Sequence, residues 1–317
     1  MRAGRSLPVR VLRIAVLALV VWAAYRALAP QLETLRGEDL AAVRPNGWLL
    51  AVSTVAIVAV YIMHALLWRL ITTALTHVNL PLRSAMRVYF VSSLGRYLPG
   101  KLWQIAGLAA LSAEAGIPAS GAIAASILAQ VAFMTTGALL LAVLLPAYGT
   151  AALIAGAGLL AVVVAGFVVL TTRRGARLRR RLADRLGPRF GGALDMIDRV
   201  TPRAAATWWL LYLGSWIVLG LAFAVFVTAF EPQAAERTLT LGGVVAASYL
   251  LGYITPLPAG IGAREGVMAA LLTAVLPPAA AVVVSASSRL WFTAGELLPL
   301  TLIPLLPRQR AVSGAHP

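Results

Sequence analysis

Long, uninterrupted apolar runs dominate this sequence and limit what it can fold into. A helix needs about 20 apolar residues to cross a bilayer, and several runs reach that length, including residues 204–230. Hydrophobic residues make up 60% of the 317 residues and charged residues only 12%, which excludes an ordinary soluble domain. Because the runs are continuous rather than alternating, they predict helices and not barrel strands. We therefore expect an all-α polytopic membrane protein.

The predicted topology has about six full spans and two interrupted segments. The interrupted segments, 84–111 and 239–276, contain proline, glycine and charge, so each predicts a re-entrant or broken helical hairpin. The six predicted spans lie at about 11–29, 47–71, 117–145, 148–170, 204–230 and 277–306. The first span also resembles a signal peptide, but Pro30 directly after the candidate cleavage site favours an uncleaved helix.

The distribution of charge predicts the orientation. Residues 171–203 hold ten arginines against three aspartates, and the positive-inside rule places such a loop in the cytoplasm. The basic N-terminus and the basic tail fall on the same side. We expect a multi-pass protein of a bacterial or archaeal cell membrane with both termini cytoplasmic. The arginines could also bind anionic lipid headgroups, although a solvated loop explains them equally well.

The order of the segments repeats within one integral membrane domain. Residues 1–145 read as span, span, hairpin, span, and residues 146–317 read the same way. The first half starts inside and the second half starts outside, so the halves have opposite orientations, as in many secondary transporters. We expect an inverted repeat that brings the two hairpins together. The oligomeric state stays open, a homo-oligomer included.

The interrupted segments and the last span place ionisable side chains at membrane depth. These residues are Arg96, Lys101, Arg264, Glu265, Arg289 and Glu296. Each costs about 2.5–3.5 kcal/mol at the bilayer centre when unpaired, so they should face one another or a wet cavity. Arg264 with Glu265 and Arg289 with Glu296 are candidate ion pairs, in some combination. Arg96 and Lys101, the one lysine of the chain, would then be left to attract an anionic phosphate.

Proline and glycine break the helices beside these charges. Pro99 and Gly100 interrupt the first segment, and Gly260 and Gly262 interrupt the second. The N-terminus of a half-helix presents free backbone N–H groups and a positive dipole end, which favour an anion. We therefore take these four residues, together with the six charged residues above, as candidate substrate-binding residues.

Several of these features also have purely structural interpretations. The two cations of the first segment could snorkel to the interface without a ligand. Arg264 and Glu265 could form a structural pair, and Gly262–Gly266, as a G-x-x-x-G pattern, could pack helices. Arg289 and Glu296 lie seven residues apart on roughly one helix face, so they could lock that helix to a neighbour.

Two motifs resemble a known family, the membrane region of lysylphosphatidylglycerol synthases. LGRYLPGKLWQ at 94–104 is similar to its Gly-Arg-Tyr-x-Pro-Gly-Lys-x-Trp motif, and PLPAGIGAREG at 256–266 to its Pro-x-x-Gly-(Leu/Ile)-Gly-x-Arg-Glu-Gly motif. Arg289, with Gly295 in the same helix, fits the closing segment. Pro258-Ala259 departs from the Pro-Gly of many relatives. The resemblance implies translocation of lipids or lipid-linked molecules between leaflets.

The synthases of this family add a soluble aminoacyl-transfer domain after the membrane region. Because this chain stops at Pro317, we expect a stand-alone member without synthase activity. The leading hypothesis is a flippase for a lipid or a lipid-linked sugar, in which Arg264, Glu265 and Arg289 form a gate opposite the cations of the first hairpin.

Two other classes of function remain as alternatives. One is a membrane enzyme that acts on lipid phosphate with Glu265 or Glu296 as its base. The chain has no cysteine and only three scattered histidines, so we expect no metal and no cofactor. The other is a non-catalytic partner protein that acts through its arginine loop. Nucleic-acid binding would need a soluble domain, and no segment is long enough for one.

Overall fold

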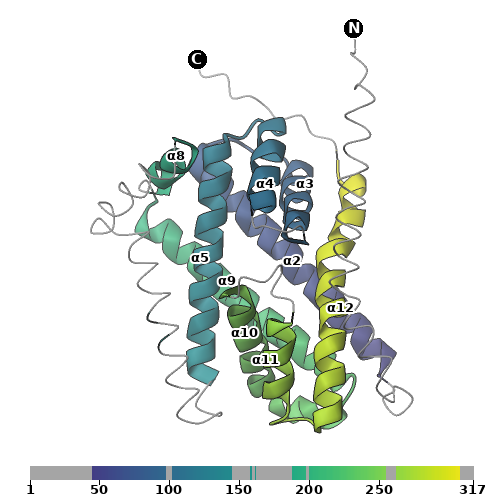
Figure 1. Ribbon diagram of the computed structural model, residues 1–317. Coiled ribbons are helices and arrows are strands. Elements are labelled where there is room, and N and C mark those ends of the chain that lie inside the picture. The colour runs from purple at the N-terminus through teal and green to yellow at the C-terminus, as the bar shows by residue number, and fades with distance from the viewer. Residues whose placement is uncertain are drawn as a thin grey trace, which may run out of the picture.

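The computed structural model describes residues 45–97, 102–144, 188–197, 200–254 and 262–307, together with residues 158 and 161. The regular elements of these ranges are helices, which confirms the all-α class (Figure 1). Three of the described helices are long and apolar enough to cross a bilayer, namely α2 (Gly47–Thr76), α5 (Ala119–Leu144) and α9 (Pro202–Thr228). The predicted spans 11–29 and 148–170 fall outside the described ranges apart from those two positions. The number of spans therefore stays a prediction.

Both interrupted segments form helical hairpins, as predicted. The first consists of α3 (Leu82–Ser93), the 3-10 turn η1 (Leu94–Tyr97) and α4 (Leu102–Glu114). The second follows the 3-10 turn η3 (Pro232–Arg237) and consists of α10 (Thr238–Ile254) and α11 (Ala263–Leu272). With 10 to 17 residues, each arm is shorter than the roughly 30 Å of a hydrocarbon core. The hairpins enter from opposite ends, and their tips point toward the middle of the molecule (Figure 1).

The described helices pack in the order that an inverted repeat requires. α2 packs on α3 as α9 packs on α10, and α4 packs on α5 as α11 packs on α12 (Pro278–Leu302). α2 and α9 pack against each other between the halves. α5 also contacts α10, and α12 contacts α3, so each hairpin rests on a long helix of the other half. Each half thus holds the hairpin of the other half.

Side-chain caps set the starts of α2 and α9, within a few residues of the predicted spans. Asn46 begins α2, since its Oδ1 accepts hydrogen bonds from the N–H groups of Trp48 (3.0 Å) and Leu49 (3.2 Å). Thr201 caps α9 in the same way, with Pro202 at its first position. The second predicted span is too short, because α2 continues to Thr76. The last helix ends at Leu302 and passes into a 3-10 turn, η5 (Ile303–Leu305).

Part of the arginine-rich segment is a packed helix and not a solvated loop. α8 (Pro188–Ile197) lies against α5, with Ala193, Leu194 and Ile197 buried. These apolar residues recur at helical spacing, which outweighs the surrounding charge. The loop interpretation is therefore wrong for residues 188–197. Most of the arginines of this segment lie outside the described residues.

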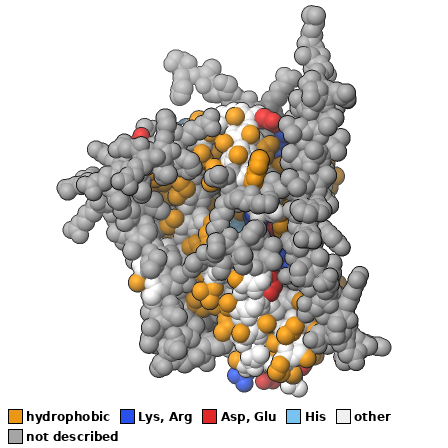
Figure 2. Space-filling view, in the orientation of Figure 1, with side chains coloured by type: hydrophobic (Ala, Val, Ile, Leu, Met, Phe, Trp, Pro, Cys, Tyr) orange, Lys and Arg blue, Asp and Glu red, His pale blue; other side chains and the backbone are white. Residues whose placement is uncertain are grey.

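Aromatic side chains fill the contact between α5 and α9. The ring of Trp216 stacks on Phe133 with centroids 4.5 Å apart, and its indole N–H donates to the Phe133 carbonyl oxygen at 2.8 Å. Gly137 leaves room for that indole, since a Cβ there would lie 2.5 Å from it. On the outside, Figure 2 shows hydrophobic side chains across the described surface of one face. Leu210 and Leu221 of α9 are exposed as well, which suits contact with lipid.

Candidate functional site

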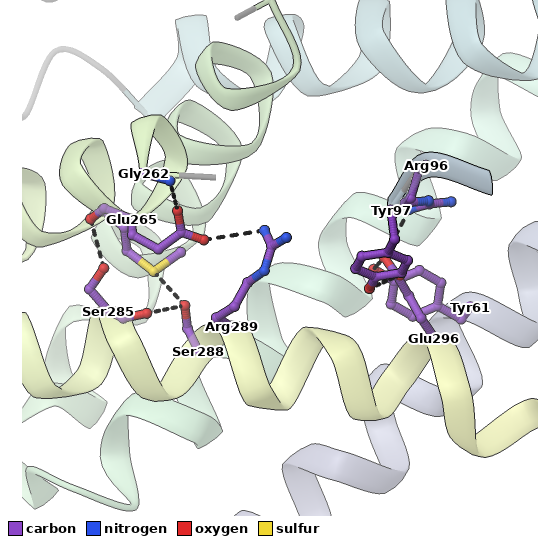
Figure 3. A network of polar contacts seen from close by, with 10 residues as sticks. Tyr61, Arg96, Tyr97, Gly262, Glu265, Ser285, Ser288, Arg289 and Glu296 are labelled. Carbon is purple, nitrogen blue, oxygen red and sulfur yellow. Dashed lines mark hydrogen bonds and ion pairs between the residues drawn. The ribbon is translucent and has the colours of Figure 1, made fainter. Parts of the chain in front are cut away.

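Helix α12 carries two charged residues of opposite sign, and each faces a different hairpin. Arg289 is 4% exposed and Glu296 is 8% exposed. Seven residues are two helical turns, so the two positions lie about 10 Å apart along the axis. Figure 3 shows both side chains rising from the same side of α12, Arg289 toward Glu265 of α11 and Glu296 toward η1. One helix thus connects both hairpins.

The Glu296 carboxylate forms the first polar cluster by accepting three hydrogen bonds. Its Oε1 accepts from the Tyr61 hydroxyl at 3.1 Å and from Nη1 of Arg96 at 2.8 Å. Its Oε2 accepts from the Tyr97 hydroxyl at 2.7 Å. Arg96 also donates through Nε to the carbonyl oxygen of Ser93 at 3.0 Å, which fixes its orientation. This cluster fastens the tip of the first hairpin to α2 and α12.

The Glu265 carboxylate forms the second cluster. Its Oε2 accepts from the backbone N–H of Gly262 at 2.7 Å, and its Oε1 accepts from Nη1 of Arg289 at 3.3 Å. The Ser285 hydroxyl donates to the Glu265 carbonyl oxygen at 2.7 Å. Gly262 has a φ of +82° and begins α11, a conformation that glycine adopts without steric cost. The second hairpin is therefore fastened to α12 by its own pair.

Arg264 lies next to Glu265 in sequence but occupies a separate environment. Its guanidinium carbon is 3.6 Å from the ring centroid of Phe292 and 4.9 Å from that of Tyr249, a cation–π arrangement. The residue is 9% exposed, and its Nη2 has no hydrogen-bond partner among the described residues. Gly252 of α10 makes room for it, because a Cβ there would lie 2.8 Å from the Arg264 Cβ.

A small cavity lies beside these rings, between the two halves of the molecule. Its volume is about 10 Å³, which is room for about one water molecule. Tyr61, His64, Tyr249 and Phe292 are among its lining residues. His64 is buried, and its Nε2 lies 3.0 Å from the Ser215 hydroxyl oxygen, so it is a packed polar residue. As the described residues line it, this cavity is too small for a lipid headgroup.

The candidate charges do form ion pairs, but in a different combination from the two named first, and Arg96 joins in place of Arg264. Arg289 pairs with Glu265, and Arg96 pairs with Glu296. Residues seven apart on one helix lie too far apart to meet, and adjacent helical residues point in different directions. The two charges of α12 pair with two neighbouring hairpins, as the structural alternative for this helix expects. Arg96 is therefore neutralised by a carboxylate, whereas Arg264 has no such partner among the described residues.

Four of the predicted site residues, namely Pro99, Gly100, Lys101 and Gly260, lie outside the described residues. The other six are brought together around α12. Sequence reasoning missed the tyrosines Tyr61 and Tyr97 that share the Glu296 carboxylate, and it missed the Phe292 ring under Arg264. Only Tyr97 carried a signal, because it stands inside the charged first motif.

Residues of both motifs thus lie in the polar clusters around α12. The family comparison covers the residues of both motifs. A family model described as the lysylphosphatidylglycerol synthase TM region matches residues 10–293. The chain belongs to this family. The match includes both hairpins and Arg289, and it stops just before Glu296. No curated protein and no solved structure matches the chain. Membership in the lysylphosphatidylglycerol synthase TM family, with the apolar helices, supports a membrane function connected with lipids.

Proposed function

We propose that this protein translocates a lipid or a lipid-linked molecule across the cell membrane and recognises an anionic headgroup between its two hairpins. One observation carries the proposal: a single helix, α12, binds the tips of two hairpins that enter from opposite ends. Substrate sites of inverted-repeat transporters lie where broken helices of the two repeats meet. The family adds the connection with lipids.

The two ion pairs suit a site that opens from one side at a time. Arg96–Glu296 holds the first hairpin and Arg289–Glu265 holds the second, so one pair can separate while the other persists. A buried ion pair contributes little net stability, because its desolvation offsets much of its attraction. Replacing one ion pair by contacts with water and a charged headgroup should therefore cost the fold little stability. Under this proposal the structure, with its small cavity, is a closed conformation between two open ones.

We place the protein in the cytoplasmic membrane of a bacterium or archaeon with both termini inside, on the strength of its basic termini and basic central segment. Under this proposal the hairpin residues, Lys101 included, contact substrate and not a cofactor. The arginine-rich segment then lies beside anionic headgroups of the inner leaflet.

Reconstitution into vesicles tests the proposal. Wild-type protein in phosphatidylcholine vesicles with fluorescent phosphatidylglycerol should make inner-leaflet probe accessible to an impermeant quencher, and protein-free vesicles should not. Lys101→Ala should abolish the movement, whereas Arg237→Ala, a change of an exposed arginine in η3, should leave it intact.

An assay of the purified protein in detergent distinguishes a translocator from an enzyme. Purified protein in detergent has no second leaflet, so a lipid-modifying enzyme would still form product there and a translocator would not. Product formation in detergent, or full movement by Lys101→Ala, would count against the proposal.

A further inference from the structure

We infer that Arg264 is the receptor for a negatively charged phosphate on the transported molecule. This inference rests on the proposed translocation and assigns its substrate class. It moves the phosphate contact from the first hairpin, where sequence reasoning had put it, to the first turn of α11.

The first argument is the balance of charge at the centre. The described centre holds three arginines, the buried Arg264 and Arg289 and the partly exposed Arg96. Against them stand two glutamates, the buried Glu296 and the partly exposed Glu265. Both carboxylates are already engaged by the other two arginines. The positive charge of Arg264 therefore lacks a carboxylate among the described residues. A desolvated cation at membrane depth is costly and marks a substrate path in many membrane proteins.

The second argument is the geometry of the guanidinium. Phe292 lies 3.6 Å from its central carbon, so the ring supports one face of the planar group. Stacking leaves the edge of a guanidinium available for hydrogen bonds, and Nη2 has no partner among the described residues. A guanidinium edge matches two oxygens of a phosphate. Arg264 is also the second residue of the ten-residue helix α11, whose N-terminal end adds positive potential.

The third argument is the way neighbouring residues hold Arg264 in place. Gly252 removes the side chain that would otherwise displace its Cβ. Glu265 is turned toward Gly262 and Arg289 and does not neutralise it. In the closed structure the aromatic rings of Phe292 and Tyr249 are its partners. When the hairpins separate, a phosphate can bind the guanidinium edge by charge-assisted hydrogen bonds while the Phe292 ring stays against its face.

The ligand chemistry is a phosphate monoester or diester with a negatively charged oxygen. A lipid that lacks phosphate would not satisfy Arg264. A water-soluble phosphate ester has the same chemistry, so the test must distinguish the two sources.

Binding to the purified full chain in uncharged detergent tests the inference without requiring transport. Three probes are compared: dioctanoyl phosphatidylglycerol, dioctanoylglycerol with the same tails and no phosphate, and glycerol 3-phosphate with no tails. Wild type should prefer phosphatidylglycerol over dioctanoylglycerol. Arg264→Gln should weaken that binding about tenfold or more. Arg237→Gln, which removes an exposed arginine, should bind like wild type.

Each outcome decides the inference. Equal affinity of wild type and Arg264→Gln, or equal binding of the two lipids by wild type, overturns it. A tenfold loss for glycerol 3-phosphate as well supports it with a soluble ester as the source. If Arg264→Gln does not fold, Arg264→Lys keeps the charge without the planar fork. Its affinity should fall severalfold, and an unchanged affinity overturns the inference. Binding without any lipid movement by wild type would instead defeat the translocation proposal alone.

Discussion

At the scale of single residues, the buried Glu296 carboxylate joins elements that are distant in sequence. Glu296 is shared by an arginine and two tyrosines, and its Arg96 partner lies 200 residues away. The side chain of Arg96 is 26% exposed and that of Glu296 is 9% exposed, so solvent screens the pair only in part. Breaking one partner leaves the other charge poorly compensated.

A double-mutant cycle measures this pair. Arg96→Gln and Glu296→Gln should each lower the free energy of unfolding, and the double variant should lose less than the sum, with a coupling energy of about 1–2 kcal/mol. Denaturation in mixed micelles is the measurement. The matched control is Arg87 with Glu114, whose side chains are 53% and 48% exposed, and whose coupling should be smaller. Additive effects at Arg96 and Glu296 would contradict the cluster.

Replacing each of the two glycines of the G-x-x-x-G pattern by alanine should have opposite effects on stability. Gly262 has a φ of +82°, so Gly262→Ala should cost about 1–3 kcal/mol of stability and disturb the start of α11. Gly266 lies inside α11 with no described atom within 4 Å of an added Cβ, so Gly266→Ala should be neutral or stabilising. Thermal unfolding of the two purified variants compares them. A large loss for Gly266→Ala would revive the interpretation of the pattern as a helix-packing motif.

At the scale of elements, a glycine in the first arm of each hairpin allows its two arms to approach closely. A Cβ at Gly95 would lie 2.6 Å from the backbone nitrogen of Gln104 in α4. A Cβ at Gly252 would lie 2.8 Å from the Arg264 Cβ in α11. Backbone and Cβ atoms cannot move aside as the end of a flexible side chain can. The same device therefore serves both hairpins.

Adding a methyl group at either glycine should open the hairpin. We expect Gly95→Ala and Gly252→Ala each to cost about 1–3 kcal/mol of stability through overpacking, and to slow lipid movement in vesicles. Gly214→Ala in α9 is the control, because no described atom lies within 4 Å of an added Cβ there, and it should behave like wild type. Wild-type stability of both hairpin variants would show that the arms are not held at these contacts.

Most of the described helices were predictable from sequence, and the features that were not have physical reasons. Apolar runs of bilayer length give α2, α5 and α9, and the proline–glycine breaks give the hairpins. α8 was not predicted because the arginines around it hide a short apolar face. The start of α2 after its cap Asn46 falls where it was predicted, but α2 continues to Thr76, and α9 begins at Pro202, after its cap Thr201.

At the scale of the whole molecule, the meeting of the hairpins was predictable but the pairing inside it was not. Charge signs and segment order predict an inverted repeat, and the described helices pack accordingly. Which arginine meets which glutamate depends on the rotation of each helix about its axis and on the tilt between helices. Sequence spacing does not fix either quantity, so Arg264 was paired with its neighbour Glu265 and its contact with Phe292 stayed hidden.

The most direct test of the central claim is the sidedness of the two hairpins. The chain has no cysteine, so single cysteines can report it cleanly. Ala113→Cys places a thiol at the exposed base of the first hairpin, and Ala274→Cys places one at the exposed base of the second. In intact cells an impermeant maleimide should label Ala274→Cys and leave Ala113→Cys unlabelled until the membrane is permeabilised. Labelling of both from the same side would contradict the inverted repeat and the shared lipid site between its hairpins.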